Sequence, residues 1–111
     1  MLSRKALTVA SLSTLVCSTP GAVAQEAFDG AKFLEYSRTT RDNYISTAAG
    51  MAGVIATQNR PDQAKCIDRW VAENSANGFE PALDVMRKQP KFHPLGVLLA
   101  VLQKSCGSFK Y

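Results

Sequence analysis

Histidine and cysteine, the residues that most often bind metals or carry out nucleophilic chemistry, are scarce in this sequence of 111 residues. It contains one histidine and three cysteines. His93 alone cannot form a zinc site, and no Cys-x-x-Cys pair is present to tune thiol reactivity. The motifs typical of serine hydrolases, zinc proteases and phosphate-binding loops are also absent. These absences argue against an enzyme and against a bound cofactor or metal.

Long apolar runs and alternating strand patterns are missing as well. No apolar run reaches the ~20 residues needed to cross a bilayer, and the apolar segment 95–102 is best interpreted as protein core. From residue 25 onward the apolar residues follow a helical period, with no repeat or low-complexity segment. The short links between the expected helices predict one compact all-α domain, a small bundle of four or five helices.

The first 24 residues have the three parts of a secretory signal peptide. Arg4 and Lys5 form a positive start, 6–16 is apolar, and 22–24 offers the small residues of a cleavage site. We therefore expect residues 1–24 to be a cleaved signal peptide and the protein to be periplasmic or secreted.

A retained membrane anchor is the alternative interpretation of this leader. The apolar part, 6–16, is too short for a transmembrane helix. Cys17 follows Val16 rather than the small residue that lipidation needs, so we expect it to leave with the leader. The mature protein is then a helical extracytoplasmic domain of residues 25–111.

Removal of the leader lowers the positive charge. The full chain has 13 Lys plus Arg and 9 Asp plus Glu, and loss of Arg4 and Lys5 leaves 11 bases, a net charge near +2. The remaining bases are scattered among acids, as in Arg41-Asp42 and Asp68-Arg69, and form no stripe that could neutralise phosphates. The charge pattern argues against nucleic acid as a partner.

Cys66 and Cys106 remain after cleavage, and paired cysteines in an oxidising compartment are normally joined. We expect a disulfide between them. Closing a loop of this length stabilises a fold by about 4 kcal/mol through loop-closure entropy. A redox-active pair is the alternative, and the missing Cys-x-x-Cys spacing argues against it.

Caps, prolines and glycines predict where the helices begin and end. The first expected helix covers 27–37, and a longer one runs from an N-cap at Thr39 or Thr40 to about Thr57. The third covers 61–74, and the fourth lies between the turn at Asn77-Gly78 and Pro90. The last runs from Pro94 to Cys106, with Gly107 as its C-cap.

The expected core comes from apolar residues at helical spacing. In the long helix the predicted buried stripe is Tyr44, Ala48, Met51 and Ile55. In the later helices the predicted buried positions are Cys66, Ile67, Trp70 and Val71, then Phe79, Leu83 and Met86, and finally Leu95, Leu98, Leu99, Leu102 and Cys106.

Gly50 and Gly53 lie beside the predicted stripe of the long helix. Each glycine inside a helix costs about 1 kcal/mol relative to alanine. We interpret both as positions where another helix approaches closely, with a ligand cradle as the alternative.

One segment carries apolar and basic residues that no helical stripe uses. It contains Arg87, Lys88, Lys91, Phe92 and His93. We predict that Phe92 anchors a protein partner while the basic residues steer it. The alternative is an ordinary solvated loop with Phe92 folded onto the core and His93 capping the last helix.

Several features of the sequence, taken in order along the chain, resemble those of the Rap/Tai family of type VI secretion immunity proteins. These features are Tyr44-Ile45-Ser46 with the small-residue run 48–53, then Cys66, a helix ending at Gln89-Pro90, and a final amphipathic helix 95–106. Members are small exported helical proteins that guard the periplasm against secreted effectors. The resemblance implies a helical fold and a toxin as protein partner.

The architecture is also similar to that of the Hde-type acid-stress chaperones, which are exported, helical and closed by one long-range disulfide. That resemblance implies unfolded client proteins as partners. We therefore expect a non-enzymatic protein that binds or neutralises another protein, with a periplasmic stress chaperone as the alternative. An accessory subunit or a small enzyme is a third possibility, and the sequence leaves the oligomeric state open.

Overall fold

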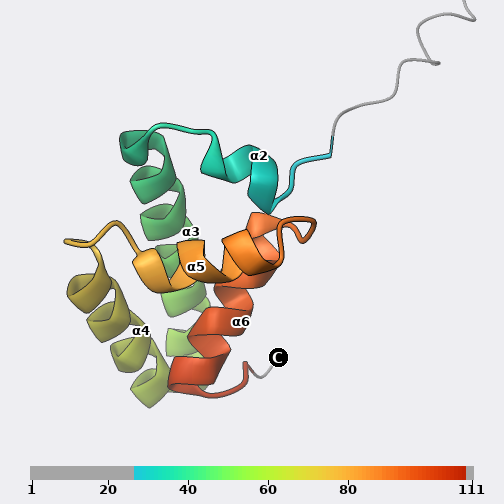
Figure 1. Ribbon diagram of the computed structural model, residues 1–111. Helices are drawn as coiled ribbons and strands as arrows, with labels where there is room; N and C mark the ends of the chain where they lie inside the picture. Colours follow the sequence, from blue (N-terminus) through green and yellow to red (C-terminus); the bar gives the residue numbers. More distant parts are fainter. Residues whose placement is uncertain (1–26, 110–111) are drawn as a thin grey trace, which may run out of the picture.

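A computed structural model describes residues 27–109 of the chain, and the predicted signal peptide, 1–24, lies outside the described residues. These residues form five helices: α2 (Gly30–Leu34), α3 (Arg38–Asn59), α4 (Pro61–Asn74), α5 (Glu80–Lys88) and α6 (Pro94–Cys106) (Figure 1). No strand is present among them. The predicted all-α bundle of four or five helices is confirmed.

The first two helices begin at side-chain caps. Asp29 accepts a hydrogen bond from the Lys32 N–H at 2.9 Å, and Ser37 accepts one from the Thr40 N–H at 3.2 Å. The first helix is therefore shorter than the predicted 27–37. The predicted cap at Thr39 or Thr40 was wrong: the N-cap is Ser37, whose hydroxyl accepts from the Thr40 N–H, so the helix already begins at Arg38.

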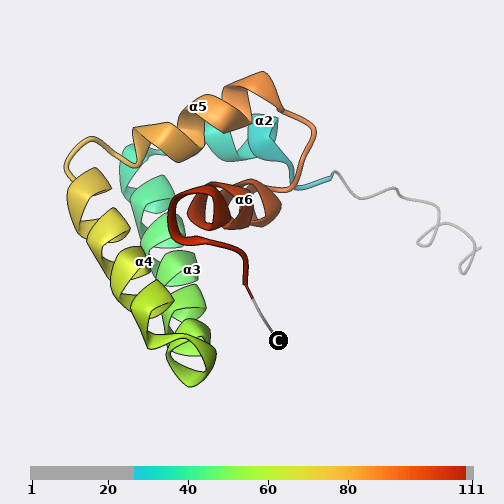
Figure 2. The same ribbon diagram turned by 90° about the horizontal axis from the view of Figure 1, so that it is seen from below.

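A single residue, Arg60, separates α3 from α4, and Pro61 occupies the first position of α4 as predicted. This sharp connection folds α4 back along α3. In both ribbon views α4 runs alongside α3, and α6 packs against both helices (Figures 1 and 2). A Cβ atom at Gly53 would lie 3.8 Å from Ile67 of α4, so the predicted close approach is confirmed at Gly53.

At Gly50 the same prediction was wrong. No atom of another element lies within 4 Å of the position that its Cβ would occupy. The glycine is exposed on the outer side of α3.

The predicted buried stripe of α3 was wrong at Met51 and Ile55, whereas Tyr44 and Ala48 do pack against the core. Met51 and Ile55 are 61% and 52% exposed, while Tyr44 and Ala48 are half-buried. The residues that face the core are Ile45, Ala49, Ala52, Gly53 and Ala56. Small side chains fill this stripe because α4 packs closely against it, and larger residues would hold the two helices apart.

The turn before α5 positions an aromatic pair of the core. Gly78 and Phe79 both have left-handed backbone angles, with φ of +71° and +59°. This conformation is uncommon for phenylalanine. Here it places the Phe79 ring, 1% exposed, stacked on Trp70 with 5.7 Å between ring centroids.

The predicted core positions of α4 and α5 are largely confirmed, with Ile67, Trp70, Phe79, Leu83 and Met86 buried. In α6, Leu98 and Leu102 are buried as predicted, but Leu95 is 37% exposed and Val97 takes a core position instead. Among residues 27–109, the buried residues of the hydrophobic core cluster are Phe33, Ile45, Ala49, Ala52, Ala56, Ala64, Ile67, Trp70, Phe79, Ala82, Leu83, Met86, Val97, Leu98 and Leu102.

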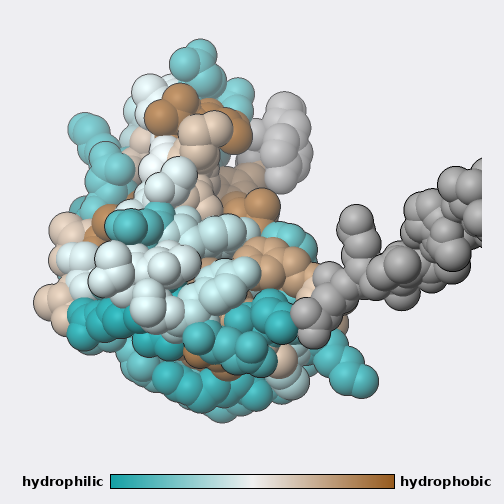
Figure 3. All heavy atoms as spheres, turned by 90° about the horizontal axis from the view of Figure 1, so that it is seen from above, coloured by the Kyte–Doolittle hydropathy of each residue, from teal (hydrophilic) through white to brown (hydrophobic). Residues whose placement is uncertain are grey.

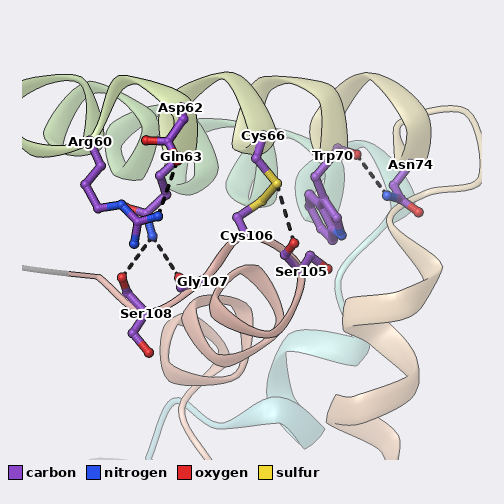
Figure 4. The surroundings of a disulfide bond; sticks show 10 residues. All are labelled: Arg60, Asp62, Gln63, Cys66, Trp70, Asn74, Ser105, Cys106, Gly107 and Ser108. Carbon is purple, nitrogen blue, oxygen red and sulfur yellow. Dashed lines mark hydrogen bonds and ion pairs between the residues drawn. A yellow bond between two sulfur atoms is a disulfide. The ribbon is translucent and has the colours of Figure 1, made fainter.

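The predicted disulfide joins Cys66 of α4 to Cys106 at the end of α6, with Cα atoms 5.6 Å apart. Trp70 lies one turn further along α4 (Figure 4). On the other side of the bridge, buried Gln63 donates hydrogen bonds from Nε2 to the carbonyls of Gly107 and Ser108 at 2.7 and 3.1 Å. Together these contacts hold the end of α6 against α4.

Candidate protein-binding surface

The five predicted partner-binding residues lie together where α5 joins α6. Arg87 and Lys88 end α5, Lys91 and Phe92 lie in the link, and His93 is the N-cap of α6. All five are exposed. We call them the link surface.

Two of the three basic residues in the link surface are already paired with acids of α5. Arg87 Nη2 donates to Glu80 Oε1 at 3.2 Å, and Lys88 Nζ lies 3.0 Å from an oxygen of Asp84. The hydrogen bond from Arg87 holds the pKa of Glu80 below its ordinary value. Lys91 forms no ion pair with residues 27–109. The steering charge of this surface therefore rests mainly on Lys91.

His93 has a structural role. Its Nδ1 accepts a hydrogen bond from the Leu95 N–H at 3.0 Å, which caps α6. Its ring also contacts Phe28 edge to face, with 5.2 Å between ring centroids. These contacts agree with the capping alternative for His93.

Phe92 is 60% exposed and does not fold onto the core. Its backbone is nevertheless held on both sides. The Phe92 carbonyl accepts from the Gly30 N–H at 2.9 Å, and its N–H donates to the Gln89 carbonyl at 3.2 Å. Beside the ring lies a shallow, mainly apolar depression whose other lining residues are Val85, Gln89, His93, Gly96, Val97 and Ala100.

A second exposed apolar surface, which sequence reasoning missed, covers the outer side of α3. Its apolar members are Met51, Val54 and Ile55, each more than half exposed. Next to it, between α3, α6 and Phe109, lies an apolar hollow of about 190 Å³ lined by Ala48, Met51, Ala52, Ile55, Ala56, Asn59, Gln63, Leu95, Leu99 and Phe109. The space-filling view shows apolar residues (brown) reaching the surface in groups among hydrophilic ones (teal) (Figure 3).

One signal in the sequence could have revealed this surface. Ala49, Ala52 and Ala56 form a second stripe at helical spacing, parallel to the predicted one. Their small size suits a tightly packed neighbour such as a helix that follows after a one-residue turn. Because the larger residues Met51 and Ile55 were predicted to be core, the exposed apolar side of α3 was not predicted.

Residues 27–109 contain no cluster of three or more His, Cys, Asp or Glu side chains that could hold a metal ion. None of the helices in this part of the chain is both long and apolar enough to cross a membrane.

Comparisons with protein-family models, with curated proteins and with solved structures give no match to this chain.

Proposed function

We propose that this protein is a non-enzymatic, exported binding protein that sequesters or neutralises another protein, in the manner of the Rap/Tai immunity proteins. The link surface is the proposed contact, with Phe92 as its anchor. The signal-peptide pattern of residues 1–24 and the disulfide, which is compatible with an oxidising compartment, support the proposed export.

The observation that carries this proposal is the exposure of Phe92 on a held backbone. An exposed aromatic side chain on a held backbone has few torsions left to fix on binding, and such residues are common centres of protein interfaces. The ring is 60% exposed, although its carbonyl and N–H are both hydrogen-bonded. The neighbouring depression gives a partner side chain a place next to this ring.

The test is capture and neutralisation by the mature, oxidised protein. Immobilised protein should retain a partner from periplasmic extract, and adding the protein should relieve the toxicity of that partner. Phe92→Ser should weaken capture by at least tenfold, as expected for loss of an aromatic anchor. Its melting temperature should change little, since the ring is largely in solvent.

Val54→Ser is the matched control. It also removes an exposed apolar side chain, but from α3 rather than from the link surface. Capture should stay at the parent level. Equal capture by Phe92→Ser and the parent, or no partner retained by the parent, would contradict the proposal.

The chaperone alternative has a different outcome. An acid-activated chaperone would protect unfolded clients only below about pH 4, where carboxylates become protonated. The Glu80 pKa lies below its ordinary value, so the stabilising effect of its ion pair is present above that ordinary value and is lost only as the pH falls through the lowered one. A binding protein of the proposed kind should keep its fold and its partner capture in mild acid, above the pH at which carboxylates become protonated.

A further inference from the structure

The apolar hollow beside α3 is enclosed by three parts of the chain. α3 contributes buried Ala52, α6 contributes half-buried Leu99, and Phe109 contributes from beyond the end of α6. Met51 and Ile55 also line the hollow, and both are more than half exposed. The hollow therefore reaches from the core to the surface and is open to a molecule from solvent.

Hydrogen bonds of two glutamines hold the third wall in place. Buried Gln63 of α4 points towards the segment after α6 and donates to the carbonyls of Gly107 and Ser108 at 2.7 and 3.1 Å (Figure 4). Gln103 Oε1 accepts a hydrogen bond from the Phe109 N–H at 3.0 Å. These contacts fix the backbone after α6 and so keep the Phe109 side chain at the hollow.

No charged side chain among residues 27–109 lines the hollow, and its lining is apolar apart from the amides of Asn59 and Gln63. The amide nitrogens of both residues donate to carbonyls of the chain itself, that of Asn59 to Ile55 at 3.4 Å. A charged ligand would lose hydration here without gaining an opposite charge. The lining therefore favours an uncharged, apolar molecule.

The volume of the hollow, about 190 Å³, restricts the size of that molecule. An apolar cavity of ~150 Å³ stays dry and binds benzene, whereas sites for drug-sized ligands begin at about 300 Å³. Side chains around an empty apolar space also lack the dispersion contacts that a molecule filling it supplies. A single aromatic ring matches this volume.

We propose that the hollow is a binding site for a small, uncharged apolar molecule of the size of one aromatic ring, held by contacts with α3, α6 and Phe109. The site is separate from the link surface and does not depend on the function proposed for that surface. Toluene has the chemistry and the size of the proposed ligand and serves as the probe.

The test is a toluene titration of the mature, oxidised protein with isotopically labelled methionine methyl groups, followed by NMR. Two methionines follow the leader: Met51, which lines the hollow, and Met86, which is fully buried elsewhere in the core. The Met51 methyl signal should shift and saturate below the aqueous solubility of toluene. The Met86 signal should keep its position and is the internal control.

Ala48→Phe should weaken toluene binding at least tenfold, because Ala48 lines the hollow and the added ring takes up its space. Ala100→Phe is the matched control. It adds the same ring at another helical alanine, but on α6 in the depression beside Phe92. This variant should bind toluene like the parent.

Phe109→Ala tests the third wall without adding volume. It should weaken toluene binding severalfold, because the side chain that encloses the hollow beyond α6 is removed. Its melting temperature should change little, since Phe109 is only half-buried and follows the last helix. This variant tests the site even where Ala48→Phe does not fold.

Benzoate tests the predicted absence of charge. It has a ring of the same size with a carboxylate, and it should bind at least tenfold more weakly than toluene because the lining offers no opposite charge. Equal affinity for benzoate and toluene would overturn the proposal.

A Met51 signal that does not saturate, equal shifts of Met51 and Met86, or unchanged toluene binding by Ala48→Phe would also overturn the proposal. A parent that does not bind toluene, but loses partner capture on Ala48→Phe, would assign the hollow to a side chain of another protein. That result would overturn the small-molecule site as well.

Discussion

At the scale of single residues, buried Gln63 has the clearest polar role. It is 2% exposed, and its Nε2 donates to the carbonyls of Gly107 and Ser108 beyond the end of α6. Because these two carbonyls lie beyond the end of α6, no backbone N–H of that helix can donate a hydrogen bond to them. A side chain of α4 therefore satisfies the end of α6 from a position distant in sequence.

Gln63→Leu should lower the free energy of unfolding by about 1–3 kcal/mol, because it keeps the volume but leaves the two carbonyls without this donor. Urea unfolding of the oxidised protein measures the change. The same substitution at Gln89, whose side chain is exposed, serves as control and should change stability by less than about 0.5 kcal/mol. Equal effects at the two positions would show that the Gln63 hydrogen bonds do not stabilise the fold.

At the scale of helices, α6 depends on burial along one side. Leu98 and Leu102 are fully buried, whereas Leu95 near the start of the helix is 37% exposed at the edge of the apolar hollow. Pro94 begins the helix and Gly107, with φ of +92°, ends it. The ends of α6 are thus set locally, and its stability comes from the core.

Leu98→Ala and Leu102→Ala should each cost about 2–5 kcal/mol of unfolding free energy, because each leaves a cavity in a close-packed core. Leu95→Ala should cost clearly less, since solvent already reaches its side chain. Thermal or urea unfolding of the three variants gives the comparison. If Leu95→Ala is the most destabilising of the three, the described orientation of α6 is wrong.

At the scale of the whole molecule, the disulfide closes the bundle between α4 and the end of α6. It spans 40 residues of sequence, including all of α5. After reduction, only the hydrogen bonds of Gln63 and the packing of the core leucines would still hold the end of α6 against α4. The bridge therefore stabilises the packing of elements that are far apart in the chain.

Reduction should lower the free energy of unfolding by about 4 kcal/mol in the loop-closure picture. It should also increase Trp70 fluorescence, because Trp70 is 7% exposed and lies one turn from a quenching disulfide. Mass spectrometry of the intact protein should give a value lighter than the reduced formula by two hydrogen atoms. Two titratable thiols in denatured, non-reduced protein would contradict the bridge.

Local chemistry in the sequence determined the boundaries of α4 and α6, the disulfide and the core of α4 and α5. Pro61, Pro94 and Gly107 stand where α4 and α6 begin and α6 ends, because proline and glycine act on the backbone whatever surrounds them. Strongly amphipathic helices such as α5 have one apolar side, so helical period alone identifies their buried residues.

Only the tertiary structure decided which side of α3 is buried. This helix has two apolar stripes, one with Met51 and Ile55 and one with Ala49 and Ala56, and helical period cannot choose between them. The choice depends on how closely α4 approaches after the one-residue turn at Arg60, and close approach selects the small residues. The larger apolar residues of α3 are thereby left on the surface, where a second molecule can reach them.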